Sequence, residues 1–198
     1  AISPATTKKV ASAFDDMPVN FIDGGLIGLN PVKENERTRL YVSGKATALV
    51  RQLDGRGLVV RDLSGEIGRA SAMKMVYASS TKGAFSLFAA VAVMAELTGL
   101  RDEIFAELAA SQPHTMATIE RMAPRIPLDA KRWIFEMDEI ASTYDAYGMT
   151  AHFHQGAADI MKLANQTPLA SETRETAQDN RALADVLQLY VDALRAKT

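Results

Sequence analysis

A stretch of about thirty residues without proline limits most strongly what this chain can fold into. Residues 67–99 contain no proline and consist mainly of Ala, Met, Leu and Val. Because proline ends or kinks helices, this stretch predicts one helix of about 45 Å, at about 1.5 Å per residue. A helix this long and apolar needs packing partners on most sides. Gly83 lies inside it and marks a predicted bend or close crossing.

The residues before this helix alternate between helix and strand patterns. Pro4 opens a predicted helix, and the later segments follow the order strand, strand, helix, strand, at 19–23, 38–43, 45–53 and 57–61. This order is typical of part of a layered α/β domain. Everything after the long helix is helical in pattern, with predicted helices over 101–110, 115–122, 129–147, 150–165 and 180–196. We therefore expect an α/β remnant to about residue 63 and an all-α domain from residue 64.

Charge and composition argue against several classes of protein. The 198 residues carry a formal net charge of -2, which does not favour nucleic-acid binding. The chain has no cysteine, so disulfides and thiolate metal sites are excluded, as suits a reducing cytoplasm. The longest apolar run, Ala84–Ala95, is shorter than the roughly 20 residues that span a bilayer, and no targeting segment precedes it. We expect a cytoplasmic protein with no membrane contact.

The start of the long helix carries the most informative residues. Small residues around Gly68 and Ser71 let backbone N–H groups approach an anion closely. Lys74 follows about two turns into the helix and shares a face with Ala78 and Thr81. A lysine in an otherwise apolar helix either extends its ammonium group to solvent or has a function, and the pattern alone leaves both open.

Four segments together resemble the β-hydroxyacid and 6-phosphogluconate dehydrogenases, and they occur in the order of that superfamily. Gly68 and Lys74-Met-Val resemble the glycine turn and lysine of its interdomain helix. The other three are Phe21–Gly28, which is similar to the substrate loop, Ile2-Ser3-Pro4, and Trp133–Ala141 in the helix that closes the active site. A phosphogluconate dehydrogenase-like subgroup is the most similar.

The resemblance implies a fold, a cofactor and a reaction. Residues 1–63 would be the C-terminal part of a Rossmann-type dinucleotide-binding domain, and residues 64–198 a helical dimerisation domain that forms a homodimer. The implied reaction is hydride transfer between NADP or NAD and a small hydroxy-acid-like substrate, with Lys74 transferring the hydroxyl proton. Lys74 would have to be neutral, with a pKa below its ordinary value of about 10.4. A neighbouring Lys82 would lower that pKa.

The resemblance also implies site residues. Substrate binding falls to Ile27, Gly28, Ser71, Ala78, Thr81 and Lys82, and cofactor binding to Ser3, Pro4 and Gly68. No metal ligand is implied; His152 and His154 lie two apart, on different faces of a helix.

Several of these positions depart from the family pattern. Ala78 stands where many members have Asn, and Thr81 where the phosphogluconate enzymes have a general-acid Glu. Ile27 replaces a serine, and Asp138-Glu139 replaces a Lys-Asp pair. These changes predict a substrate other than 6-phosphogluconate.

No Gly-x-Gly-x-x-Gly turn occurs in the chain, although the family binds the cofactor pyrophosphate there. About one hundred residues are therefore expected to precede Ala1. Two alternatives stay open: a non-catalytic helical dimerisation module on the same scaffold, and an imine-reductase-like enzyme.

Overall fold

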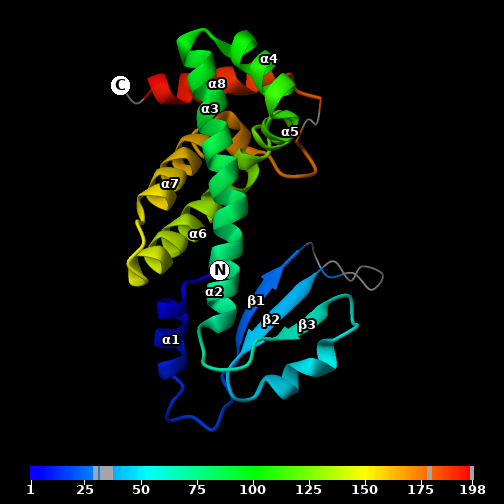
Figure 1. Cartoon of the computed structure of the whole chain (residues 1–198), viewed down its shortest axis with the longest axis vertical. Coiled ribbons are helices and arrows are strands. Elements are labelled where there is room, and N and C mark those ends of the chain that lie inside the picture. The colour runs from blue at the N-terminus through cyan, green and yellow to red at the C-terminus, as the bar shows by residue number, and fades with distance from the viewer. Residues whose placement is uncertain (29–30, 32–37, 178–179, 197–198) are drawn as a thin grey trace. The chain divides into compact units, whose positions relative to one another are not determined.

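The computed structural model describes residues 1–28, 31, 38–177 and 180–196. The chain forms two compact units. The sheet unit consists of Ala1–Ala78 and Glu139–Ala151, and the helical unit of Ser79–Asp138 and His152–Thr198. Figure 1 labels the helices and strands of both units.

Three short strands form the sheet of the sheet unit. They are β1 (Asp23–Ile27), β2 (Arg39–Ser43) and β3 (Val59–Asp62), in the order β1-β2-β3. β1 pairs antiparallel with β2, and β2 pairs parallel with β3 (Figure 1). The predicted second and third strands are confirmed within two residues. The prediction of a first strand over 19–23 is wrong, because β1 begins at Asp23 and continues through Gly24 and Gly25 to Ile27.

Two helical segments flank this sheet within the sheet unit. α1 (Pro4–Ser12) begins as predicted, with Pro4 in its first turn. The hydroxyl of Ser3 accepts a hydrogen bond from the N–H of Thr6 at 3.2 Å and so caps the helix. The segment predicted as a helix over 45–53 is a 3-10 helix, Thr47–Leu53, in which Thr47 is the buried residue.

The predicted long helix is confirmed as one continuous helical segment, Arg69–Thr98. It consists of α2 (Arg69–Ala78), a π-helical turn (Ser79–Gly83) and α3 (Ala84–Thr98), and it ends at Gly99, whose φ is +69°. The irregularity expected at Gly83 takes the form of this π-helical turn, which adds a residue to the helical repeat without a break.

α3 buries one face and exposes the other. Ala89, Ala92 and Val93 are buried, whereas Leu87 is 61% and Met94 55% exposed. Packing within the described residues covers one face of α3, and the expectation of partners on most sides stays a prediction for the other face. The helix Arg69–Thr98 is long and apolar enough to cross a membrane, but one such helix, with 39% of its most apolar window buried, is weak support for a span because core helices pass the same criteria.

Among the described residues, five α-helices and a short 3-10 helix, Pro168–Ser171, follow α3. The α-helices are α4 (Arg101–Ser111), α5 (Pro113–Met122), α6 (Ile126–Ala146), α7 (His152–Ala164) and α8 (Leu183–Arg195). The core of the helical unit includes the fully buried side chains of Ile119, Ile126, Met137, Met161, Leu187 and Tyr190. The hydroxyl of Tyr190 donates to the carbonyl of Ala123 at 3.0 Å, and burial raises the pKa of this phenol far above its ordinary value.

The predicted fold class, a partial α/β domain followed by helices, is confirmed by this architecture. The packing units divide the chain elsewhere than at residues 63 and 64, because α2 packs against β1 and β2, and residues 139–151 belong to the same unit. The domain boundary at 63/64 stays a prediction.

Candidate functional site

A buried carboxylate organises the start of α2. Asp23, the first residue of β1, is 3% exposed. Its Oδ2 accepts hydrogen bonds from the N–H of Gly68 at 2.9 Å, the N–H of Ser71 at 3.0 Å and the hydroxyl of Ser43 at 3.0 Å. Its Oδ1 accepts the hydroxyl of Ser71 at 2.6 Å. The N–H groups that were predicted to bind a ligand anion therefore donate to the carboxylate of Asp23. This negative charge also interacts favourably with the positive end of the dipole of α2.

A glycine in β1, Gly25, allows the backbone of α2 to pack unusually close to the strand. A Cβ atom on Gly25 would stand 2.6 Å from the carbonyl oxygen of Ala70 and 3.1 Å from the Cβ of Lys74. Real Cβ contacts are essentially never that short, so only glycine permits this spacing. Asp23 and Gly25 thus fix the position of α2 on the sheet from the same strand.

This arrangement brings Lys74 to the edge of β1. Its Nζ donates a hydrogen bond to the carbonyl oxygen of Leu26 at 2.5 Å. Leu26 lies within Phe21–Gly28, the predicted substrate loop, and directly before Ile27 and Gly28, its two predicted substrate-binding residues. Lys74 is half-buried rather than fully extended to solvent.

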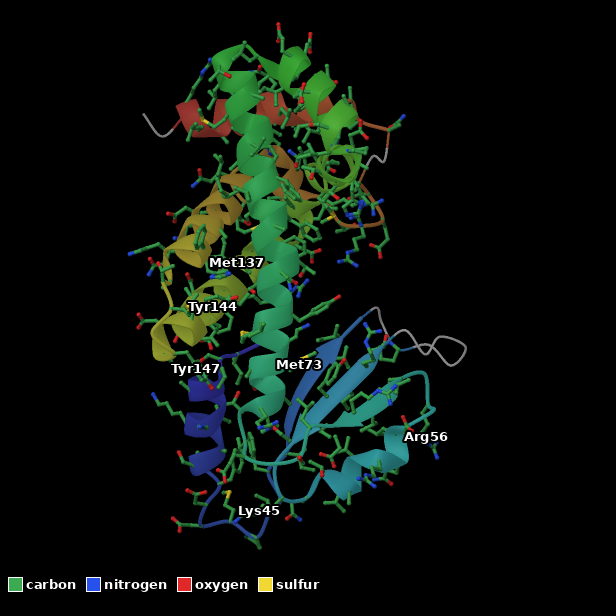
Figure 2. The ribbon with its side chains drawn as sticks, viewed as in Figure 1. Lys45, Arg56, Met73, Met137, Tyr144 and Tyr147 are labelled. Carbon is green, nitrogen blue, oxygen red and sulfur yellow. The ribbon has the colours of Figure 1, made fainter. Side chains whose placement is uncertain are left out.

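A pocket of about 410 Å³ lies between α1 and α2 in the sheet unit. It brings together Pro4 and Gly68, two of the three residues predicted to bind cofactor. Gly68 has a φ of +105°, and a Cβ there would lie 3.2 Å from Lys8 Cε and 3.3 Å from Pro4 Cβ. The remaining lining residues are Lys8, Leu63, Arg69, Ala72, Met73 and Tyr147, of which Met73 and Tyr147 are labelled in Figure 2.

Ser3, the third predicted cofactor residue, is 1% exposed and held by internal partners. Its backbone N–H donates to Oε2 of Glu139 at 2.5 Å, and its hydroxyl caps α1. Glu139 thereby ties the end of α6 to the first residues of the chain within the sheet unit.

Three predicted substrate residues point into the protein. The side chains of Ile27 and Ala78 are 2% and 1% exposed. Ser71 is 5% exposed, and its hydroxyl lies 2.6 Å from both Asp23 Oδ1 and the hydroxyl of Thr7. Gly28 differs from them, because it is exposed and has a φ of +125°.

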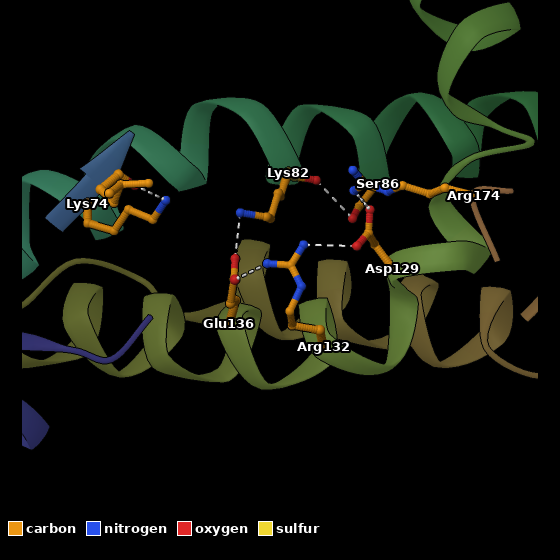
Figure 3. A network of polar contacts seen from close by, with 8 residues as sticks. Lys74, Lys82, Ser86, Asp129, Arg132, Glu136 and Arg174 are labelled. Carbon is orange, nitrogen blue, oxygen red and sulfur yellow. Dashed lines mark hydrogen bonds and ion pairs between the residues drawn. The ribbon is translucent and has the colours of Figure 1, made fainter. Parts of the chain in front are cut away.

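The other two predicted substrate residues, Thr81 and Lys82, lie in the helical unit. Lys82 Nζ is 2.5 Å from Oε2 of Glu136, and the two side chains are 12% and 5% exposed. Arg132 reaches the other oxygen of Glu136 at 2.8 Å (Figure 3). The Lys82 ammonium also lies 5.6 Å from the centroid of the Trp133 ring, within the range of a cation–π interaction.

Sequence reasoning missed the structural roles of Asp23, Gly25 and Glu139. Asp23 stood in a quoted motif, but nothing in the sequence pairs it with Gly68, 45 residues away. The consecutive glycines at 24 and 25 are the one sequence signal for a close backbone approach. Glu136 lies in the quoted segment Trp133–Ala141, but its pairing with Lys82 depends on tertiary contacts.

Comparisons with known proteins support the fold. A family described as "Domain of unknown function (DUF1932)" matches residues 95–164. No curated protein matches the chain by sequence. Among solved structures, a conserved hypothetical protein from Sinorhizobium meliloti has a TM-score of 0.73 at 20% identity, over 97% of this chain and 64% of that one.

Two further structures connect the fold to dehydrogenases. A 3-hydroxyisobutyrate dehydrogenase from Salmonella typhimurium has a TM-score of 0.58 at 16% identity, over 94% of this chain and 66% of that one. A conserved protein of unknown function, described as structurally similar to 3-hydroxyacid dehydrogenases, has a TM-score of 0.55 at 20% identity, over 98% of this chain and 63% of that one. The chain thus has a 3-hydroxyacid dehydrogenase-like fold and spans just under two thirds of the length of these structures.

Proposed function

We propose that the protein is an NAD(P)-dependent oxidoreductase that transfers a hydride between the cofactor and a small hydroxy-acid-like alcohol, with Lys74 as the proton-transfer residue. The observation that carries this proposal is the hydrogen bond from the Lys74 ammonium to the carbonyl of Leu26, two residues before the exposed Gly28. The dehydrogenase-like fold supports the reaction class. A phosphogluconate dehydrogenase-like subgroup remains part of the proposal.

The pocket that contains Pro4 and Gly68 fits a role in binding the cofactor. Gly68 leaves no room for a side chain on its pocket face. Lys8 and Arg69 line the same pocket as exposed cations, and they would attract the phosphates of NADP or NAD. The cofactor, when bound, supplies a nicotinamide carbon that accepts or donates hydride.

The chain's own chemistry in this proposal is proton transfer by Lys74. During oxidation, neutral Nζ accepts the proton of the substrate hydroxyl, while the carbon that bears this hydroxyl gives up a hydride to the nicotinamide. During reduction, the ammonium returns that proton to the oxygen. The hydrogen bond to Leu26 orients Nζ, and Asp23 and Gly25 hold the helix that carries it. Roles for Thr81 and Lys82 in substrate binding stay predictions.

Cofactor binding and turnover by the polypeptide that the natural gene encodes test this function. NADPH and NADH are titrated by their fluorescence, and a panel of small 2-oxo and 3-oxo acids is then screened for cofactor oxidation. We expect saturable binding of at least one cofactor, a weakening of about tenfold in Arg69→Gln, and oxidation with at least one acid. Arg56→Gln serves as the control, because Arg56 is exposed and does not line this pocket.

One observation favours a non-catalytic alternative. Three polar groups at predicted site residues have hydrogen-bond partners inside the protein: the hydroxyls of Ser71 and Ser3 and the N–H of Gly68. These hydrogen bonds are what a purely structural role would require. If the polypeptide that the natural gene encodes binds neither NADPH nor NADH, the result would support the non-catalytic alternative and contradict the proposed oxidoreductase function.

The helical unit is also proposed to form a homodimer. Leu87, Val91 and Met94 recur at helical spacing on α3 and are 61%, 37% and 55% exposed. Leu100 and Ile104 extend this apolar face along a groove of about 350 Å³. Met94→Asp should convert the dimer to a monomer in sedimentation, whereas the exposed polar change Glu103→Gln on α4 should not. A monomeric parent protein would contradict this proposal.

A further inference from the structure

A pocket of about 680 Å³ lies wholly in the helical unit. It is lined by the end of α5, the first half of α6, Phe85 of α3, and Glu172, Arg174, Ala177 and Arg181. None of the residues predicted from sequence to bind substrate or cofactor lines it. Its size falls within the range of small-molecule sites.

One wall of this pocket is aromatic. The rings of Phe85 and Trp133 lie 6.4 Å apart between centroids, at an angle of 34°. Met122, Pro124 and Leu128 extend the apolar lining. The indole N–H of Trp133 is buried and has no acceptor among the described residues. The wall therefore suits a flat or branched apolar group.

The remaining lining is charged, with more arginines than carboxylates. Arg121, Arg125, Arg174 and Arg181 border the pocket, together with the carboxylates of Glu120, Asp129 and Glu172. Arg181 is paired with Glu172 at 2.7 Å. Arg121 is exposed and forms no ion pair with the residues that the structure describes.

Alternating charges connect Lys82 at one end with Arg174 at the other (Figure 3). Glu136 binds Lys82 and Arg132, and Asp129 binds Arg132 and Arg174, at 2.9 and 2.8 Å for the last two contacts. Three cations therefore share two carboxylates, which leaves an excess positive charge. Arg174 is 75% exposed, so its guanidinium has donors available for a further anion.

We propose that this pocket binds a small organic anion, one with an apolar or aromatic body and a carboxylate or phosphate group. The apolar body would pack against Phe85 and Trp133, and the anionic group would meet Arg174 and Arg121. Guanidinium groups bind carboxylates and phosphates in paired hydrogen bonds, so both anions share the recognising chemistry. This site goes beyond the proposed oxidoreductase function and does not depend on it.

Trp133 makes the proposal directly measurable, because it is the only tryptophan in the chain. The 198-residue chain, without NADH or NADPH, is titrated with 3-phenylpropionate, phenyl phosphate and the neutral 3-phenylpropionamide while the emission of Trp133 is recorded. We expect a saturable change with at least one of the two anions, and an affinity at least about tenfold weaker for the amide. The two anions distinguish a carboxylate site from a phosphate site.

Arginine variants assign the response to this pocket. Arg174→Gln and Arg121→Gln should each weaken binding of the preferred anion by about tenfold. Arg101→Gln, a change to an arginine of α4 that does not line the pocket, should leave the affinity unchanged. Equal affinity for anion and amide, unchanged affinity in both pocket variants, or no saturable change with either anion would overturn the proposal. Failure here leaves cofactor binding in the sheet unit untouched, so the two proposals fail separately.

Discussion

Asp23 accepts two hydrogen bonds from Ser71, one from its backbone N–H at 3.0 Å and one from its hydroxyl at 2.6 Å. The same carboxylate accepts from Gly68 and Ser43, so β1 and the start of α2 meet at one buried anion. The position of Lys74 on α2 therefore depends on a residue 51 positions earlier in the sequence. Most of the following predictions test connections of this kind.

Asp23→Asn should destabilise the protein by about 2–3 kcal/mol, because hydrogen bonds to a charged acceptor are strong and an amide cannot accept at both ends. Urea unfolding followed by circular dichroism measures this change. Asp145→Asn is the control, since Asp145 is exposed, and it should shift the free energy of unfolding by less than about 0.5 kcal/mol. Equal effects of the two substitutions would argue against the role of Asp23.

Gly25→Ala should cost about 1–3 kcal/mol, because the new methyl group would stand 2.6 Å from the carbonyl oxygen of Ala70 and force α2 off the strand. Gly24→Ala in the same strand is a matched control. Its Cβ would meet only the Leu40 side chain, at 3.6 Å, so the loss should be small. The comparison by urea unfolding contradicts the close-approach argument if both alanines are tolerated equally.

Lys82→Met should destabilise the helical unit by about 3 kcal/mol, because it leaves the buried carboxylate of Glu136 with Arg132 alone. The double variant Lys82→Met/Glu136→Leu should recover part of that stability, because it also removes the carboxylate that the single variant leaves without Lys82. Lys162→Met breaks the exposed pair with Asp159 and should cost less than about 1 kcal/mol. Thermal unfolding of the four proteins decides this; a double variant less stable than Lys82→Met would contradict the pairing.

His154 should make stability depend on pH. Burial lowers the pKa of His154 below its ordinary value of 6.5, so the unfolded chain binds this proton at a higher pH than the folded one. The contribution is fully present above pH 6.5 and is lost as the pH falls from there through the folded pKa.

Urea midpoints at about pH 7.5 and about pH 5.5 measure this loss. His154→Gln should reduce the difference between the two midpoints, whereas His114→Gln, at an exposed histidine, should not. An unchanged difference in His154→Gln would show that other groups cause the pH dependence.

The sequence predicted the elements that depend on local patterns. The helix over Arg69–Thr98, the helix start at Pro4 and the strands β2 and β3 follow from periodicity, proline and glycine positions. β1 was misplaced, because Gly25 lies inside the strand, where it makes room for the backbone of α2. A glycine that makes room for another backbone looks, in sequence, like a glycine that turns the chain.

The candidate site was predictable only at residues that belong to a segment resembling the dehydrogenase family. Lys74, Pro4 and Gly68 came from a family resemblance, and the structure brings the last two together at one pocket. The sequence could not show that Ile27 and Ala78 are buried or that Ser71 is held by Asp23 and Thr7. The pocket beside Trp133 was also invisible, because its lining is brought together from α3, α5, α6 and the segment before α8.

Turnover by a Lys74→Ala variant tests the central claim most directly. The natural polypeptide and the variant are compared by cofactor oxidation with an oxo acid found in the screen, and by cofactor affinity. Lys45→Ala, at an exposed lysine of the sheet unit, is the control. The account predicts that Lys74→Ala lowers kcat by at least about a hundredfold, as expected for loss of a proton-transfer group, while cofactor affinity and the Lys45→Ala rate stay near normal. A Lys74→Ala variant with near-normal kcat would contradict it.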